Sequence, residues 1–511
     1  MKKFVGKGEC YMPYVLSYDL GTSGIKASLF DENASCLKQT VAEYPTSYRT
    51  GGICEQSPKD WWSALKTATA SLISEGIDVA QISAIGLSGH SLGVVAIDKN
   101  GNLLSEQTPI WSDARAVEET KAFFSVVDER EWYETTGCGL SSHLYSVFKI
   151  MWYQKHEPTL YQNAVTFFGT KDYINFCLTG VIATDHSYAS GSGVYDLQKR
   201  CYRTDWIAKA GLDADKFPPI FESDEVIGTV RHEIAAELGL PSGVAVVGGG
   251  VDNACMTLGA GCCEAGDTYA SLGSSAWISM VTDHPKVDFE KRLYTWAHCV
   301  KGMYIPSAGI YSAGTSLSWV KKNLLGEQCE DYALIETMLA TSPVGANGVI
   351  FCPVMAGGSP MDIAPDMKGA VCGIDLSIGR EDILRAVYEG MAMELLLCLN
   401  ALIADGTKEK RVLYAVGGGA MSAEARKIYA NVFDRTVLIG SMPRNAAALG
   451  AAALALKGIG LWKDYRMLKG ICVSTNAEEP DSEAVAFYKL HFQKFMLVCQ
   501  QQANLQKFLC L

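Results

Sequence analysis

Two short turns combine glycine with hydroxyl side chains, a composition suited to binding phosphate. Gly21-Thr22-Ser23-Gly24 and Gly273-Ser274-Ser275 each lie between two apolar stretches, so each predicts a β-hairpin. Glycine lets the backbone approach a ligand, and the amides and hydroxyls can donate to phosphate oxygens. One such turn alone could be a plain hairpin turn, because Gly and Ser are common there. The two copies lie about half the chain apart, which favours two hairpins that hold one polyphosphate.

A carboxylate that could act as a general base follows the apolar stretch 244–247. Three glycines separate this expected strand from Asp252 and Asn253 and leave open space beside the carboxylate. A substrate hydroxyl needs such space to bring its proton to a base. A glycine-rich loop ending in an Asx turn is the alternative. Because Asp252 comes shortly before the second hairpin, we favour the catalytic interpretation.

Other residues at the ends of expected strands could bind a metal or a nucleotide. Asp19 precedes the first hairpin, where its carboxylate could hold Mg²⁺ through water, although on position alone a turn-forming aspartate is the better explanation. Gly417-Gly418-Gly419-Ala420 joins a strand to a helix and could lie against a planar base or near a phosphate. A tight turn explains it almost as well. Ser312-Ala313-Gly314 is a weaker candidate of the same kind.

Polar and aromatic side chains suited to a polyol occur in two segments. The first is 85–93, which contains His90, Ser91 and Leu92, and the second is 110–115, which contains Trp111 and Asp113. An aromatic ring offers an apolar face for stacking, and charged groups can bind hydroxyls. Each of these residues taken singly is more often structural, and Asp113 could simply form an ion pair with Arg115.

Composition and missing motifs exclude several classes of protein. With 44 Lys and Arg against 56 Asp and Glu, the net charge is −12, which argues against nucleic-acid or anionic-membrane partners. The 17 cysteines show no paired spacing, so we expect reduced thiols. The N-terminus lacks the features of a secretory signal, and the longest apolar run, 446–456, is too short to span a bilayer. A soluble, cytoplasmic protein is predicted.

Neither a P-loop nor a G-x-G-x-x-G fingerprint after a strand is present, so a P-loop enzyme and an NAD-linked oxidoreductase are disfavoured.

The elements that would position these residues follow an α/β pattern. Ser57 and Pro58 begin an expected helix whose apolar face contains Trp61, Leu65, Ala68 and Leu72. We expect further strands at 82–87, 411–416 and 436–439, and helices at 381–403 and 423–433. The repeated hairpin predicts two related domains, which we assign to residues 1–250 and 251–511.

Taken together, these residues make the chain resemble the FGGY family of carbohydrate kinases, most closely its xylulokinase branch. The resemblance runs from about residue 15 to about residue 460. It depends on the order and spacing of the turns above together with several further short segments: Glu55-Gln56, Asp60-Trp61-Trp62, Gly86-Leu87-Ser88-Gly89, Lys171-Asp172-Tyr173, Thr179-Gly180 and Ala448-Leu449-Gly450-Ala451.

The resemblance implies two actin-like, ribonuclease H-like domains with an ATP and sugar cleft between them. It implies ATP and Mg²⁺ as cofactors, a small-molecule sugar as partner, and Asp252 as the base, with Asp19 near the metal. The implied substrate-binding residues are His90, Ser91, Leu92, Trp111, Asp113 and Asn253. The implied nucleotide-binding residues are Thr22, Ser23, Gly273, Ser274, Ser275, Gly314, Gly418, Gly419 and Ala420.

This chain departs from the family pattern in one place that bears on the substrate. Xylulokinases usually read Gly-Gln-Met-His-Gly where this chain reads Gly89-His90-Ser91-Leu92-Gly93. We expect an ATP-dependent kinase for a terminal hydroxyl of a ketose, preferably a pentulose such as D-xylulose. Two alternatives stay open for the function: a kinase that acts on another sugar, a polyol or an aldonate, and a non-catalytic ATP-binding sensor. For the assembly, a homodimer stays open.

Overall fold

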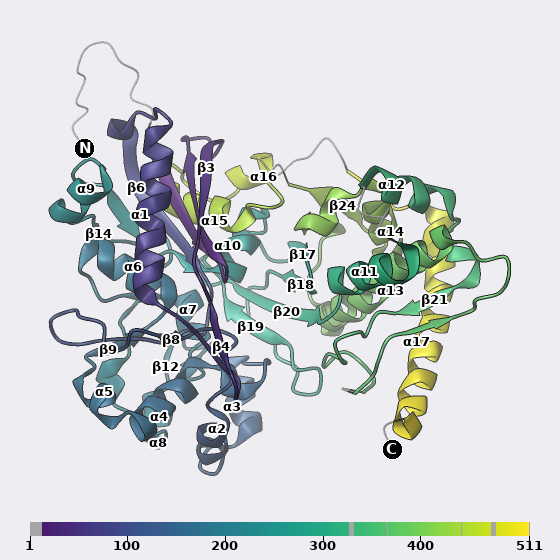
Figure 1. Ribbon diagram of the computed structural model, residues 1–511, viewed down its shortest axis with the longest axis horizontal. Coiled ribbons are helices and arrows are strands. Elements are labelled where there is room, and N and C mark those ends of the chain that lie inside the picture. Colours follow the sequence, from purple (N-terminus) through teal and green to yellow (C-terminus); the bar gives the residue numbers. More distant parts are fainter. Residues whose placement is uncertain (1–12, 327–331, 365, 441, 472–476, 510–511) are drawn as a thin grey trace. The chain divides into compact units, whose positions relative to one another are not determined.

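The computed structural model describes residues 13–326, 332–364, 366–440, 442–471 and 477–509, which form two compact units (Figure 1). Unit 1 comprises the described residues up to 128 together with 141–259 and 447–465. Unit 2 comprises 129–140, 260–446 and the described residues from 466 onward. This division differs from the single boundary near residue 250 expected from the sequence. Asp252, for example, belongs to unit 1.

A mixed sheet forms the centre of unit 1, with the strand order β14-β15-β6-β1-β2-β3. Its strands are β1 (Tyr14–Leu20), β2 (Gly24–Phe30), β3 (Cys36–Glu43), β6 (Ile82–Gly89), β14 (Val226–Thr229) and β15 (Ala245–Val247). Strands β1 and β2 form the expected first hairpin. The short strand β16 (Gly250–Val251) runs parallel to the end of β6, which is itself parallel to β1 and β15.

Alternating side chains place helices on both faces of this sheet. On one face, Tyr18 of β1 is hydrogen-bonded to Thr69 of helix α1 (Pro58–Ser74), whose expected apolar face is buried. Ser57 stands at the N-cap of α1, as expected, but its side chain makes no capping hydrogen bond. On the other face, the Ser17 hydroxyl donates to Ala448 of helix α15 (Ala446–Gly458).

Close packing of α15 depends on Gly86 of β6, because a Cβ at Gly86 would lie 2.1 Å from the Ala451 oxygen.

Unit 2 repeats the topology of unit 1. Its sheet has the order β19-β20-β18-β17-β23-β24. The strands are β17 (Thr268–Leu272), β18 (Ala276–Met280), β19 (Tyr294–Ala297), β20 (Tyr304–Ile310), β23 (Val412–Val416) and β24 (Thr436–Ile439). The antiparallel hairpin β17–β18 corresponds to β1–β2, and parallel β23 lies beside β17 as β6 lies beside β1. The sequence repeat thus corresponds to a repeated strand arrangement.

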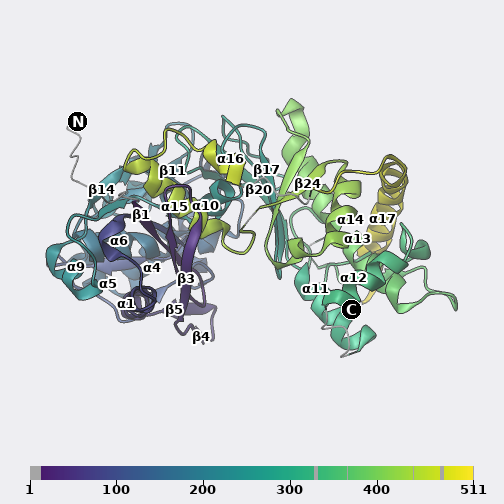
Figure 2. The same cartoon turned by 90° about the horizontal axis from the view of Figure 1, so that it is seen from above.

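Helices α13 (Arg380–Ile403), α14 (Ala423–Phe433) and α17 (Ser482–Leu509) pack together in unit 2, and two views show them side by side (Figures 1 and 2). The expected helices at 381–403 and 423–433 are therefore confirmed. Helix α13 is long and apolar enough to cross a membrane, but 78% of its apolar window is buried inside the protein, as in a core helix. The thirteen cysteines in the described ranges are free thiols.

Candidate active site

Asp19 and Asp252 meet at one edge of the unit 1 sheet. The register pairs Asp19 of β1 with Ser88 of β6, and Gly250 of β16 with the same Ser88. Helix α10 (Asp252–Gly259) begins directly after β16. Because β1, β6 and β16 are parallel, their carboxyl ends lie together, and the two carboxylates flank the end of β6. The two residues that were predicted as metal ligand and base are thus brought together.

The charges of this carboxylate pair interact. Burial raises the pKa of Asp252 to about 7, and the nearby Asp19 charge adds to this effect. The Asn253 backbone amide opposes it by donating to the Asp252 carboxylate at 2.7 Å. Burial also raises the pKa of Asp19, although the charge of Lys26 acts in the other direction. A base whose pKa lies near neutral pH can accept a proton and release it again.

A buried ion cluster holds the loop that leads to Asp252. Lys171, Asp172 and Asp185 are fully buried, and the Lys171 ammonium pairs with both carboxylates. Lys171 also donates to the Gly248 carbonyl at 3.1 Å. Asp185 accepts from the Ser187 hydroxyl, which in turn accepts from the Val251 amide at 3.0 Å. The cluster therefore fixes the backbone on both sides of the glycine turn.

In the sequence, Lys171 and Asp172 stand out only as part of a family segment, and Asp185 has no recognisable signal.

The first hairpin turn is held in place by three elements. Gln56 donates to the Thr22 carbonyl at 2.6 Å, and the Tyr44 hydroxyl donates to the Gly21 carbonyl at 2.5 Å. The Trp111 indole donates to the Thr22 hydroxyl at 3.1 Å. Ser23 is exposed. This arrangement leaves the Ser23 hydroxyl accessible, and it connects Trp111 to the expected phosphate turn.

The six expected sugar contacts differ in how accessible they are. Trp111 is 41% exposed, and Ser91 and Asn253 are half-buried. His90 is buried, and burial lowers its pKa to about 4, so its ring is neutral at pH 7. Leu92 is buried as well, with a positive φ of 61° that strains a non-glycine residue. The structure therefore leaves Trp111, Ser91 and Asn253 as the accessible members of the set.

Asp113 is the sixth member, and its carboxylate is fully engaged by protein groups. It is buried and accepts from the Cys54 amide at 2.7 Å and twice from Arg115 at 2.8 Å. The Arg115 guanidinium also pairs with Glu55 and lies over the Trp152 ring. The ion-pair alternative for Asp113 and Arg115 is therefore what the structure contains.

A buried lysine connects the two segments expected to bind the sugar. Lys149 of helix α4 (Ser146–His156) donates to the Leu92 carbonyl at 3.0 Å and to the Ile110 carbonyl at 2.7 Å. Its side chain is fully buried, and burial lowers its pKa to about 7. Sequence reasoning missed this residue, because nothing in the pattern of α4 distinguishes it from a solvated lysine.

The expected nucleotide residues of unit 2 converge on the second hairpin turn. Gly273, Ser274 and Ser275 are exposed. Gly314 donates its backbone amide to the Gly273 carbonyl at 2.9 Å, and a Cβ at Gly314 would lie 2.6 Å from that oxygen. Gly417 has a positive φ of 91°, and a Cβ there would lie 2.6 Å from the Leu272 oxygen. Glycine is therefore required at both points to let three backbone segments approach one another.

Within the same segment, Gly419 is exposed whereas Ala420 is fully buried. A Cβ built at Gly418 meets no heavy atom within 4 Å, so this position faces open space.

We expect Gly418→Val to weaken ATP binding without destabilising the protein. Because the added side chain meets open space in unit 2, it would block a bound ligand and would not disturb the packing of the core. KM for ATP should rise at least about tenfold, which corresponds to about 1.4 kcal/mol of binding free energy, while the melting temperature stays unchanged. Gly470→Val is the matched control, since Gly470 is exposed and also faces open space. Unaltered ATP affinity in Gly418→Val would remove this residue from the nucleotide site.

The carboxylates of Asp19 and Asp252 suit a magnesium ion. Within the described ranges there is no group of three or more His, Cys, Asp or Glu side chains that could hold a metal. Mg²⁺, however, commonly binds through one or two carboxylates, several waters and substrate phosphates. Asp19 and Asp252 provide two neighbouring carboxylates, which have the hard oxygen donors and the negative charge for this role. Burial raises the pKa of both, and the charge of Asp19 also raises the pKa of Asp252.

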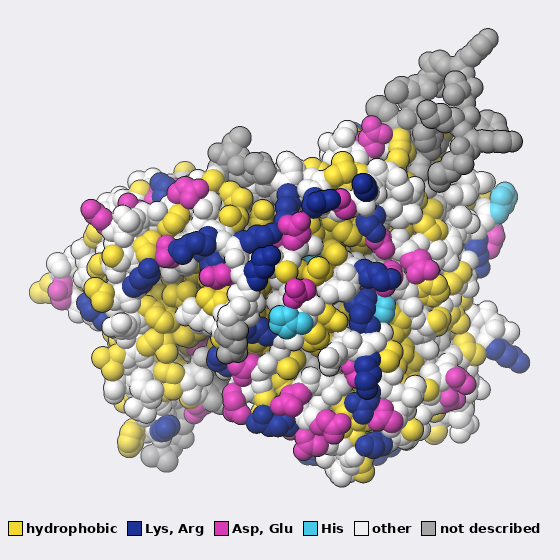
Figure 3. Space-filling view, turned by 180° about the vertical axis from the view of Figure 1, so that it is seen from behind, with side chains coloured by type: hydrophobic (Ala, Val, Ile, Leu, Met, Phe, Trp, Pro, Cys, Tyr) yellow, Lys and Arg dark blue, Asp and Glu magenta, His cyan; other side chains and the backbone are white. Residues whose placement is uncertain are grey.

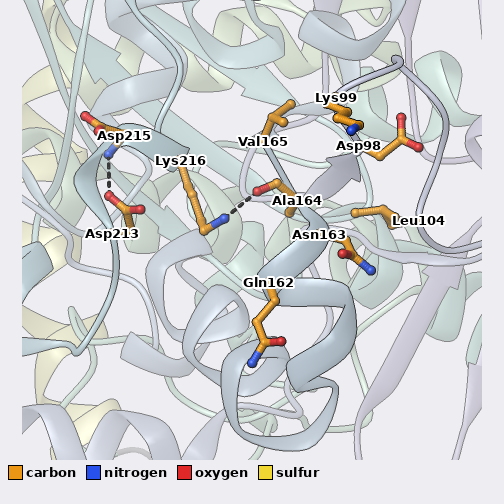
Figure 4. A pocket seen from close by; sticks show the side chains of 10 residues that line it. All are labelled: Asp98, Lys99, Leu104, Gln162, Asn163, Ala164, Val165, Asp213, Asp215 and Lys216. Carbon is orange, nitrogen blue, oxygen red and sulfur yellow. Dashed lines mark hydrogen bonds between the residues drawn. The ribbon is translucent and has the colours of Figure 1, made fainter.

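A separate polar pocket of about 600 Å³ lies on the surface of unit 1 (Figure 4). It contains none of the expected site residues. Its carboxylates already serve local turns: Asp98 accepts from the amides of Asn100 and Asn102, and Asp213 accepts from the Asp215 amide. Lys216 donates to the Ala164 carbonyl, a bond drawn in Figure 4. These side chains are thus committed to the fold.

Comparisons with known proteins find similarity along nearly the whole chain. The profile of the FGGY family of carbohydrate kinases matches residues 14–259 with its N-terminal domain and residues 268–459 with its C-terminal domain. Xylulose kinase from Bacillus subtilis is 29% identical over 478 residues, which cover 93% of each chain. Gluconokinase from Bacillus licheniformis is 24% identical, again over 93% of each chain. The crystal structure of xylulose kinase from Rhodospirillum rubrum superposes with a TM-score of 0.87 and 27% identity, covering 97% of this chain and all of that one.

Proposed function

Because the chain belongs to the FGGY family of carbohydrate kinases, which are phosphotransferases acting on an alcohol group, we propose that it phosphorylates a terminal hydroxyl of a ketose, with a pentulose such as D-xylulose as substrate. ATP is the phosphate donor of FGGY kinases. The observation that carries the proposal is the position of the Asp252 carboxylate, which lies with Asp19 at the carboxyl ends of β1, β6 and β16. Burial raises the pKa of Asp252 to about 7, which suits a base at neutral pH. Relatives with xylulose kinase activity support the choice of a pentulose.

In the proposed reaction, the predicted residues have different roles. Asp252 accepts the proton of the attacking hydroxyl, and Asn253 and Trp111 bind the sugar. The exposed Ser274 and Ser275 and the open Gly418 bind the nucleotide. Asp19 would hold Mg²⁺, which neutralises phosphate charge when bound. Phosphoryl transfer requires mainly alignment and charge stabilisation, so one base and a set of hydrogen-bond donors are sufficient chemistry.

An aldonate such as gluconate is the second candidate substrate. A gluconokinase is among the relatives, and Leu92 stands where xylulokinases usually carry a histidine. When a site lacks the side chain that would hydrogen-bond a substrate hydroxyl, that hydroxyl is left unpaired, and such a mismatch discriminates strongly against the substrate. The substitution at Leu92 therefore favours a change of substrate over a loss of the reaction.

ADP release from ATP·Mg²⁺ tests the proposal, measured with a panel of ketoses, polyols and aldonates and a control without sugar. A sharp preference for D-xylulose is the expected result. A preference for gluconate would overturn D-xylulose as the proposed substrate but would leave the proposed phosphoryl transfer in place. ATP binding without turnover on any panel member would contradict the phosphotransfer proposal and favour an ATP-binding sensor.

The pH dependence of kcat/KM should follow the ionisation of Asp252. The deprotonated carboxylate is the base, so kcat/KM should fall about tenfold per pH unit below about 7. Asp19→Asn removes the neighbouring negative charge that raises this pKa, so the acid limb should move to lower pH, whatever the residual rate. Glu118→Gln, at an exposed side chain, is the control and should leave the limb in place. A limb that does not move in Asp19→Asn would show that the two carboxylates do not interact.

A further inference from the structure

The buried Lys149 has surroundings that are unusual for a lysine. The dark blue side chains in Figure 3 lie where lysine and arginine are usually found, at the surface and often beside Asp or Glu. Lys155, on the same helix α4, is 60% exposed. Lys149 is fully buried, and its hydrogen bonds go to the backbone carbonyls of Leu92 and Ile110. Among the described residues it forms no ion pair with a carboxylate.

Burying this lysine is unfavourable for the fold. Burial outweighs the attraction of the Asp113 charge and lowers the pKa of Lys149 to about 7. The lowered pKa means that the ammonium is less stable here than in water. Lysine is almost never fully buried without a charged partner, and an apolar side chain would avoid the desolvation. Stability alone therefore does not account for a lysine at this position.

Each of the two carbonyls adjoins an accessible member of the set of expected sugar contacts. Leu92 directly follows Ser91, and Ile110 directly precedes Trp111. Ser91 is half-buried and Trp111 is partly exposed, so both can meet a ligand. Because one ammonium binds both carbonyls, it restrains the backbone at Ser91 relative to the backbone at Trp111.

The first carbonyl belongs to a strained turn. The Gly93 amide donates to the Ser91 carbonyl at 2.8 Å, and Leu92 between them has a φ of 61°. A hydrogen bond between residues two apart, with a positive φ at the central residue, is typical of the rare and strained form of the γ-turn. Strained backbone persists only where its surroundings hold it. The hydrogen bond from Lys149 to the Leu92 carbonyl is one such restraint.

The second carbonyl closes the turn that carries the exposed aromatic ring. The Ile110 carbonyl accepts from the Asp113 amide at 3.1 Å as well as from Lys149, and Trp111 lies within this turn. The Trp111 indole in turn donates to the Thr22 hydroxyl. The ammonium therefore also restrains the backbone that presents Trp111.

We propose that Lys149 is a positioning residue of the sugar site, which holds the segments of Ser91 and Trp111 at a fixed spacing through the two carbonyls. Because Lys149 is fully buried, it acts through the backbone and not by contact with the substrate. This role rests on the proposed function, since only that function makes Ser91 and Trp111 sugar contacts.

Steady-state kinetics of Lys149→Met test this role. Methionine leaves both carbonyls without their donor, and misplacement by about 1 Å can reduce activity about 100-fold. KM for the sugar, D-xylulose in the proposed function, should rise at least about tenfold, while KM for ATP stays unchanged. A merely structural lysine would not produce this difference. An unchanged KM for the sugar, or an equal rise in both KM values, would overturn the proposal.

The matched control is Lys216→Met. Lys216 also donates to a backbone carbonyl of unit 1, that of Ala164, but it lies in the separate polar pocket. Its loss should leave both KM values unchanged. If Lys149→Met does not fold, Lys149→Gln takes its place, because the amide retains N–H donors. The glutamine variant should show the same selective rise in the KM for the sugar, to a smaller extent.

Hydrogen exchange measured without substrate keeps this test separate from the proposed function. The Val94 amide donates to the Pro109 carbonyl at 3.1 Å and joins the two segments, and the Asp113 amide closes the second turn. In Lys149→Met both amides should exchange at least about tenfold faster, as expected when hydrogen bonds to a charged donor are lost. Lys216→Met should leave their rates unchanged.

The two measurements lead to distinct conclusions. Unaltered exchange of both amides in the Lys149 variant would overturn the positioning role, whatever the substrate. Absence of turnover by the unmodified protein would contradict the proposed function, and the exchange rates would still decide whether Lys149 holds the two segments together.

Discussion

The Asp252→Asn variant is expected to lose at least about 100-fold in kcat, the range that removal of a general base commonly costs. The amide cannot accept the hydroxyl proton, but it preserves the size of the side chain, and the predicted nucleotide contacts lie on other residues. ATP binding measured by calorimetry should therefore be almost unchanged. Asp98→Asn, in an exposed turn of unit 1, is the control and should turn over normally. Near-normal turnover by Asp252→Asn would remove Asp252 from the role of base.

The same variant should also be more stable than the unmodified protein at alkaline pH. The folded-state pKa of Asp252, about 7, lies above the value of about 3.9 expected in the unfolded chain. Folding therefore favours the protonated form, and stability is lost as the pH rises from about 4 through about 7. An asparagine does not ionise, so the gain in melting temperature should be small at pH 5 and larger at pH 8.

Lys171→Met is expected to be among the most destabilising single substitutions in unit 1. It leaves Asp172 and Asp185 buried without their cationic partner. Breaking a buried ion pair by removing one partner costs about 3–5 kcal/mol. Because Lys171 also binds the Gly248 carbonyl, kcat should fall through misplacement of Asp252. Urea unfolding and steady-state kinetics would measure the two effects.

Two further variants separate this effect from the general loss of a lysine. Lys199→Met removes a lysine whose side chain is 70% exposed and paired with Asp196, and it should cost no more than about 1 kcal/mol. Adding Asp172→Asn to Lys171→Met removes one of the two uncompensated charges and should recover part of the stability. If the double variant were no more stable than Lys171→Met, charge compensation would not be the role of Lys171.

Local patterns in the sequence predicted much of the framework. The apolar stretches around the two glycine turns predicted the hairpins β1–β2 and β17–β18, and the apolar face from Trp61 to Leu72 predicted α1. Strand β24 was predicted to the residue, whereas β6 extends two residues further than expected. These elements are predictable because their turn chemistry and side-chain periodicity are set by neighbouring residues.

The residues that position the site could not be predicted in the same way. Lys149 and Lys171 are buried because they bind carbonyls and carboxylates contributed by distant segments. A lysine is exposed in most proteins, so its type alone predicts the wrong environment. The single boundary near residue 250 differs from the two compact units for a related reason. Only tertiary contacts, such as Ser17 with Ala448, place α15 in unit 1.

The late position of α15 in the chain has a consequence for how the protein is made. Nearly 190 residues of unit 2 separate Gly259 from Ala447, so a ribosome adding about 5–20 residues per second needs roughly 10–40 s to synthesise them. During that interval the sheet face around Ser17 and Gly86 lacks its covering helix. Nascent unit 1 therefore exposes apolar surface to chaperones until α15 has been synthesised. A messenger RNA truncated before codon 446 would yield a unit 1 that lacks α15 permanently.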